Sequence, residues 1–233
     1  MNEMTPPGAD APRTTIASRV SRRLRAAILS GEIEPGAKIN LDRLRKDHDI
    51  SVSSAREAIG RLVVDGLVEF EDQRGYRVTP ISLENLEEVT FLRVRLEAIA
   101  LRASIDRGDI EWETTVLASL HRLNRIRRVA GDLASIEAWE VAHQRFHAAL
   151  IVGCGMPQLL SFCAILHNQN DRYRRRFLLQ TSGDRNVGAE HAAIAEAAVA
   201  RDADRAAMLL GEHIERTGSN LLARLRQEAE GGA

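Results

Sequence analysis

The sequence predicts a mainly α-helical protein in two parts: a small three-helix unit closed by a β-hairpin, followed by an all-α helical bundle. Apolar residues recur at helical spacing over most of the chain. Two β-like runs follow each other between residues 67 and 79, and strand patterns stop after Pro80. The 233 residues are 44% hydrophobic and 28% charged, so the chain can bury a core.

The composition argues against several classes of protein. No run of about 18 apolar residues predicts a membrane span, and residues 1–13 are polar and proline-rich, unlike a signal peptide. Two cysteines, Cys154 and Cys163, are too few for a disulfide framework and are expected in the core. We therefore expect a disordered tail at 1–13 and a cytoplasmic protein without a membrane partner. The net charge of −1 excludes a uniformly basic surface but not a local basic face.

The first structured part is expected at residues 14–80. Gly31 and Gly66 end its first and third helices, and Asn40 is the N-cap of its second. The expected elements are helices at 15–30, at 41–49 and from Ser53 or Ser54 to 66, and strands at 67–71 and 76–79. Three helices followed by a two-stranded hairpin is the order of a winged helix-turn-helix.

The second part, residues 81–233, is expected to be an all-α bundle of about six helices. Ser82 caps the first helix, and glycines at 108, 131, 153 and 155 mark breaks. A loop is expected at 181–184. The expected helices are 82–108, 110–130, 133–152, 156–180, 186–201 and 202–230.

Several motifs of the first part resemble the GntR family of dimeric bacterial transcription regulators. Residues 28–39 resemble the family's opening, and residues 50–59 resemble its recognition-helix motif. Residues 64–68 and 74–78 are similar to its wing. The resemblance implies a homodimer that binds double-stranded operator DNA. Val52 stands where the family usually has Arg, which implies a different operator sequence.

The residues themselves agree with DNA binding. Small hydroxyl residues at the start of the third helix, Ser53 and Ser54, let the backbone approach DNA, and N–H groups there can contact phosphate. Arg56, one turn further on, can reach a phosphate or a guanine edge. Arg74 and Gly75 at the wing tip suit the minor groove, because Gly removes bulk and Arg supplies charge. The alternative is a solvated helix with ordinary caps.

Residues 93–97 resemble the start of the FCD domain, the effector domain of the FadR-type GntR subfamily. His143 and His147 are four residues apart and share one helix face, and His191 and His213 lie on later helices. In many FCD domains a carboxylate and a histidine at that spacing join two later histidines around a divalent metal. Here His143 takes the carboxylate position, so the resemblance implies a site of four imidazoles. Imidazole favours transition metals over magnesium, zinc first, with nickel or manganese as alternatives.

Residues 108–113 and 171–174 are similar to a narrower group of FCD repressors, the carbon-starvation-induced repressors of glutarate catabolism genes. This resemblance implies a dicarboxylate or similar small acid as effector. Arg93, which can point into the bundle, and Arg172 are candidates to bind the acid, because guanidinium pairs bidentately with carboxylate. A surface salt bridge is the alternative for each. The run Arg174–Arg176 spans every direction of a helix and is expected mostly at the surface.

We therefore expect a repressor-type regulator whose operator binding responds to a small carboxylate at a metal site. An enzyme is not expected, because the histidines are accompanied by no His-Glu-x-x-His or Gly-x-Ser-x-Gly element. Glu140-x-x-His143 resembles half of a di-iron bundle site, but the sequence has no second Glu-x-x-His pair to complete it. Taken singly, each histidine is more often a polar core or surface residue than a metal ligand. The alternative functions are a metal-dependent enzyme that carries a winged helix and a winged-helix protein–protein adaptor.

Overall fold

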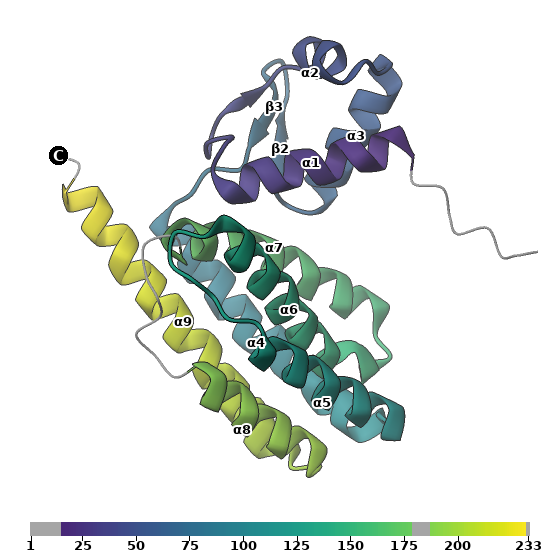
Figure 1. Ribbon diagram of the computed structural model, residues 1–233, viewed down its shortest axis with the longest axis vertical. Coiled ribbons are helices and arrows are strands. Elements are labelled where there is room, and N and C mark those ends of the chain that lie inside the picture. The colour runs from purple at the N-terminus through teal and green to yellow at the C-terminus, as the bar shows by residue number, and fades with distance from the viewer. Residues whose placement is uncertain (1–14, 179–186, 232–233) are drawn as a thin grey trace, which may run out of the picture.

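The computed structural model describes residues 15–178 and 187–231, which form a small helix-and-sheet unit standing on one end of a helical bundle (Figure 1). The tail predicted at 1–13 and the loop predicted at 181–184 lie outside these ranges. Among the helices described, none combines the length and apolar character that crossing a membrane requires.

The first unit contains three helices and a three-stranded antiparallel sheet. Thr15, Asn40 and Ser51 cap the helices, each through a side-chain oxygen that accepts from a backbone N–H three residues later. The elements are α1 (Ile16–Ser30), β1 (Lys38–Ile39), α2 (Leu41–His48), α3 (Val52–Val64), β2 (Val68–Glu71) and β3 (Gly75–Val78).

Two details of this unit differ from the sequence prediction. The third helix begins at Val52, ahead of Ser53 and Ser54, because Ser51 is the residue that caps it. The strand β1 was not predicted; it pairs with β3 and gives the sheet order β1-β3-β2. Two residues are too few for an alternating pattern to be recognised.

The second unit is all-α, and α4 lies at its centre, packed against α9, α7 and α6. Its helices are α4 (Leu83–Arg107), α5 (Ile110–Arg125), α6 (Leu133–Ile151), α7 (Pro157–Leu178), α8 (Val187–Val199) and α9 (Ala203–Gly231), with a 3₁₀ turn at Val152–Cys154. Gly218 lets α9 approach α4 closely, since a Cβ there would lie 2.5 Å from Thr90. Both cysteines are buried in this core, as predicted.

One helix boundary of the bundle was predicted wrongly. The second bundle helix, expected to continue to Gly131, ends at Arg125. Ile126 leaves helical backbone (φ −92°, ψ 115°) and packs against the bundle core. In the turn that follows, Val129 and Ala130 are exposed, so burial of apolar side chains does not hold a further helical turn there.

The two units meet on α7. Arg25 of α1 donates to Asp65 Oδ2 at 3.0 Å and also to the Asn168 side chain on α7. Gly66, just after α3, lies against α7, where a Cβ would come within 2.8 Å of the Gln169 amide. The turn that follows α3 therefore lies directly against the bundle.

Candidate metal centre and nucleic-acid interface

Four histidines from three helices converge in the bundle core. His143 and His147 come from α6, His191 from α8 and His213 from α9, and all four are buried. One ring nitrogen of each lies within 4.8 Å of one from every other, and ring centroids are 4.5–6.4 Å apart. The i, i+4 spacing on α6 puts the first pair on one face, and α8 and α9, which pack on each other, supply the second pair.

The environment keeps two of these imidazoles neutral. Burial, with the charge of Arg174, holds the pKa of His143 well below its usual range. Burial also lowers the pKa of His147 to about 4, against the opposing effect of Glu97. Neutral imidazole is the form that ligates a metal, so these two side chains do not have to lose a proton first.

The cluster fits a divalent transition metal. Both ring nitrogens of His147 are buried and make no hydrogen bond within the described residues: Nδ1 faces the Glu97 carboxylate at 3.8 Å, and Nε2 has no polar partner there, which is costly in a protein interior unless one is supplied. His213 Nδ1 lies 2.7 Å from Glu190 Oε2. When Nδ1–H donates to that carboxylate, Nε2 keeps the lone pair, which is the usual arrangement that orients a metal-ligating histidine.

His143 is held differently, by a buried arginine. Arg174 Nη1 lies 2.8 Å from His143 Nδ1, and its other nitrogen donates to Glu140 and to Asp171 Oδ1 at 2.7 Å. A guanidinium only donates, so this nitrogen of His143 must accept. His143 can therefore serve as a fourth ligand only when the hydrogen bond from Arg174 is exchanged, and three imidazoles are available without that exchange.

The expectation that the arginine run lies mostly at the surface is wrong. Arg174 is buried, Arg175 is half-buried and pairs with Glu137, and only Arg176 is exposed. Burial alone would lower the pKa of Arg174, but Glu140 and Asp171 raise it, so the guanidinium stays charged beside the histidines. Packing of α7 against α6 decides which of the three directions is buried, and sequence spacing does not contain that information.

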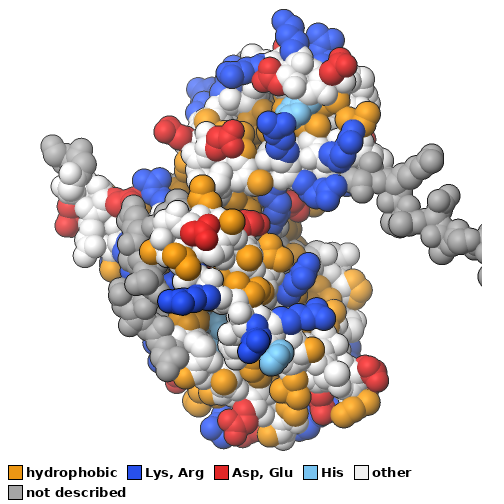
Figure 2. All heavy atoms as spheres, viewed as in Figure 1, with side chains coloured by type: hydrophobic (Ala, Val, Ile, Leu, Met, Phe, Trp, Pro, Cys, Tyr) orange, Lys and Arg blue, Asp and Glu red, His pale blue; other side chains and the backbone are white. Residues whose placement is uncertain are grey.

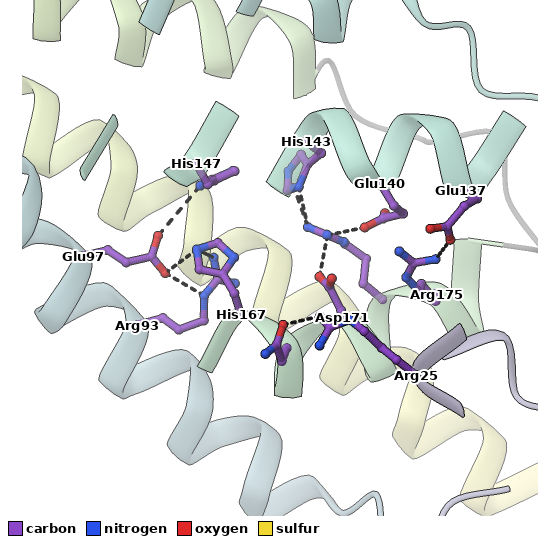
Figure 3. A network of polar contacts seen from close by, with 12 residues as sticks. Arg25, Arg93, Glu97, Glu137, Glu140, His143, His147, His167, Asp171 and Arg175 are labelled. Carbon is purple, nitrogen blue, oxygen red and sulfur yellow. Dashed lines mark hydrogen bonds and ion pairs between the residues drawn. The ribbon is translucent and has the colours of Figure 1, made fainter. Parts of the chain in front are cut away.

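A second polar cluster adjoins the histidines and was missed from the sequence. Figure 3 shows Glu97 between Arg93, His147 and His167. Its carboxylate accepts from Arg93 Nε at 2.8 Å and lies 3.2 Å from His167 Nε2 and 3.8 Å from His147 Nδ1. Burial alone would raise the pKa of Glu97, but Arg93 and His167 hold it well below its usual range. The i, i+4 pair on α4 was a signal that could have indicated this ion pair.

The two arginines suggested for the effector lie in different places. Arg93 points into the bundle beside the histidines, where Glu97 already balances its charge. Arg172 is not brought to the cluster: it donates to the carbonyls of Thr79 at 2.6 Å and Pro80 at 3.2 Å. Arg172 thus holds the segment that joins the two units, and of the two only Arg93 is positioned for a ligand at the cluster.

The predicted DNA-contacting residues lie on the surface of the first unit. Ser53 and Arg56 are exposed and Ser54 is half-buried on the first turns of α3. Arg74 is exposed at the tip of the hairpin beside Gly75, whose φ of +84° is one that Gly adopts without strain. Arg56 makes no ion pair within the described part of the chain, whereas Arg74 lies 3.4 Å from Glu71.

Comparison with known proteins identifies the family to which the chain is similar. Residues 16–78 match the family model "Bacterial regulatory proteins, gntR family", and residues 88–216 match the FCD domain. The chain is 39% identical over 196 residues to the HTH-type transcriptional regulator BphR of Paraburkholderia xenovorans LB400, covering 83% of this chain and 80% of that protein. It is 32% identical over 197 residues to the HTH-type transcriptional repressor GlaR of Escherichia coli K12, covering 83% and 90%.

Solved structures agree on the fold. Escherichia coli McbR/YncC superposes with a TM-score of 0.74 at 18% identity, covering 91% of this chain and 99% of that one. A putative GntR regulator from Rhodococcus sp. RHA1 superposes with a TM-score of 0.68 at 22% identity, covering 89% and 97%. At these identities the likeness concerns the arrangement of helices and sheet alone.

Proposed function

Because the chain belongs to the GntR family of bacterial regulatory proteins and carries an FCD domain, it is a DNA-binding transcription regulator, and we propose that it is a dimeric repressor controlled by a small carboxylate bound at a metal. The observation that carries the proposal is the buried cluster of four histidines, in which His147 Nε2 has no polar partner among the described residues.

In this proposal the histidines bind the metal, and the metal and a nearby arginine bind the effector. His147, His191 and His213 would hold a divalent metal, zinc first by the chemistry of imidazole, and His143 would complete the set or leave a position open. The metal, when bound, would supply a Lewis-acidic position for an effector carboxylate. Glu190 orients His213, and the other carboxylate of a dicarboxylate would meet a guanidinium, either Arg93 or Arg174.

The path from the cluster to DNA runs along α7. His167 touches the Glu97 carboxylate, and its neighbour in sequence, Asn168, accepts from Arg25. Arg25 in turn holds Asp65, the residue that follows α3. An effector that moves α7 would therefore move the end of the recognition helix. To act, the effector must bind the DNA-competent and the DNA-incompetent arrangements of the dimer with different affinities, typically by about 1–3 kcal/mol.

The test uses the purified full chain and a duplex operator selected from a random-sequence pool. Operator affinity is measured by fluorescence anisotropy for metal-stripped protein, zinc-loaded protein, and zinc-loaded protein with a series of straight-chain dicarboxylates. We expect one acid to weaken operator binding about 5- to 150-fold, and only when metal is present. His147→Ala should lose this response, while His121→Ala, an exposed histidine of α5, should keep it.

Two results would overturn the proposal. One is wild-type protein that binds no zinc, nickel or manganese on titration, with elemental analysis showing none after purification. The other is operator affinity that stays constant across all the acids with metal bound. Turnover of an acid at saturating metal would instead favour an enzyme.

A further inference from the structure

An exposed valine occupies the first turn of α3, the second helix of the helix-turn-helix. Val52 directly follows the cap residue Ser51, and 43% of its surface is exposed. It lies outside the hydrophobic core of the first unit, to which α3 contributes Ala55, Ala58, Ile59 and Leu62. Valine is also a weaker helix former than alanine or leucine. Neither packing nor helix propensity therefore accounts for a valine at this position.

The first turn of α3 points away from the bundle. Gly66, just after the helix, lies against α7, and the helix rise puts Val52 about 18 Å from Val64 at the other end. Figure 2 shows Lys and Arg side chains gathered over the first unit, to which α2 contributes the exposed Arg45 and Lys46. In a helix-turn-helix the first residues of the second helix contact base edges in the major groove. Val52 is therefore placed to reach the bases.

The side chains around Val52 are polar, and several are engaged within the helix. Ser51 Oγ accepts from the backbone N–H of Ser54 at 3.1 Å and donates to its hydroxyl at 3.0 Å. Glu57 pairs with Arg61 at 2.9 Å. Arg56, four residues after Val52, is exposed on the same face of the helix. Val52 thus adds an apolar contact surface beside the charged side chain of Arg56.

We propose that Val52 recognises a thymine of the operator by packing against its 5-methyl group. In the major groove, thymine presents this methyl group beside an acceptor, whereas the other bases present hydrogen-bond donors and acceptors. An isopropyl group that covers those polar edges takes them out of water without replacing their hydrogen bonds, which costs free energy. A phosphate would require a donor, which the valine side chain lacks. The apolar contact therefore favours thymine over the other bases.

The inference goes beyond the proposed function and does not depend on the metal or the effector. It requires only that the first unit binds DNA, which follows from the family to which the chain belongs. It adds a chemical feature that the operator must contain, at a position set by the first turn of α3.

The test removes the methyl group from the DNA and its contact from the protein. A duplex operator is selected from a random-sequence pool with the wild-type full chain, and its thymines are replaced one at a time by deoxyuridine, which lacks only the 5-methyl group. Fluorescence anisotropy gives the Kd for each duplex. We expect at least one position where the replacement raises the wild-type Kd about three- to tenfold, as loss of one buried methyl group should.

The same duplexes are then measured with three variants. Val52→Ala should bind the thymine and deoxyuridine duplexes for that position with Kd values within about twofold of each other. Val52→Ile keeps the branched apolar surface and should keep the difference. Val64→Ala, the same change at an exposed valine of the last turn of α3, is the matched control and should respond as wild type does.

Two results would overturn the proposal. One is a wild-type chain that is indifferent to every deoxyuridine replacement. The other is a methyl group that Val52→Ala requires as much as wild type does, since the methyl would then act through DNA shape or through another side chain. Both results leave the proposed function standing. A selection that enriches no duplex would instead count against DNA binding itself, and this inference would fail with it.

Discussion

Zinc added to metal-stripped protein should raise its melting temperature, and the histidine cluster sets the expected size. The four ligands come from α6, α8 and α9, so the site exists only when these helices are packed together. A metal that binds only the folded state stabilises it by RT ln(1+[L]/Kd), about 2.7 kcal/mol at a hundredfold excess over Kd. For a unit of about 150 residues, each kcal/mol shifts the melting temperature by about 2–4 °C. The expected rise is therefore about 5–10 °C.

The assay is differential scanning fluorimetry across a zinc titration, repeated for His147→Ala and His121→Ala. The quantity to compare is the zinc-dependent rise for each protein, since removing the buried imidazole of His147 also changes the stability of the metal-free protein. His147→Ala should lose most of the rise, and His121→Ala should keep it. Equal rises in the two variants would mean that zinc binds elsewhere. If zinc, nickel and manganese all fail to raise the melting temperature of the wild type, the four histidines have a structural role in the core and bind no metal.

Three further outcomes follow from the same geometry. Arg56→Ala should weaken operator binding by about 1–3 kcal/mol in an anisotropy titration if the side chain reads a base edge; unchanged affinity would remove it from the contact surface. Arg25→Ala should leave operator binding by metal-free protein nearly unchanged but shrink the effector response, and a full response would exclude the route through α7. Burial raises the pKa of Cys163 from 9.0 to about 12, so the thiol should resist alkylation at pH 8 in the folded protein. The stability that goes with the raised pKa is fully present below pH 9 and lost as the pH rises toward 12. The free energy of unfolding measured with urea should therefore fall over that pH range by more in wild type than in Cys163→Ala.

The fold was accessible from the sequence because its signals are local. The caps at Asn40 and Ser82 and the breaks at Gly31 and Gly108 each depend on a few neighbouring residues, and the structure places helix ends there. The errors occur where a longer-range contact decides. Ile126 leaves the helix to reach the core, and the strand β1 forms only because β3 passes beside it.

The site was accessible in part for the same reason. The spacing of His143 and His147 defines one helix face, but their neighbour Arg174 could not be identified, because three consecutive arginines point in three directions and only the packing of α7 selects one. Arg172 illustrates the converse. A family-like position suggested a ligand contact, whereas its guanidinium is occupied by the carbonyls of Thr79 and Pro80. Side chains whose role depends on which helix lies opposite are beyond what spacing alone can assign.

The helix α7 presents two faces to two different parts of the molecule. His167, Asp171 and Arg174, spaced by four and three residues, lie on the face turned to the polar clusters of the bundle. Asn168 and Arg172, four residues apart, lie on the face turned to the first unit, where they bind Arg25 and the joining segment. Successive residues of a helix differ by about 100°, so these faces cannot move independently. Under the proposed function, an effector that rotates α7 would therefore also shift Asn168 and Arg172 against the first unit.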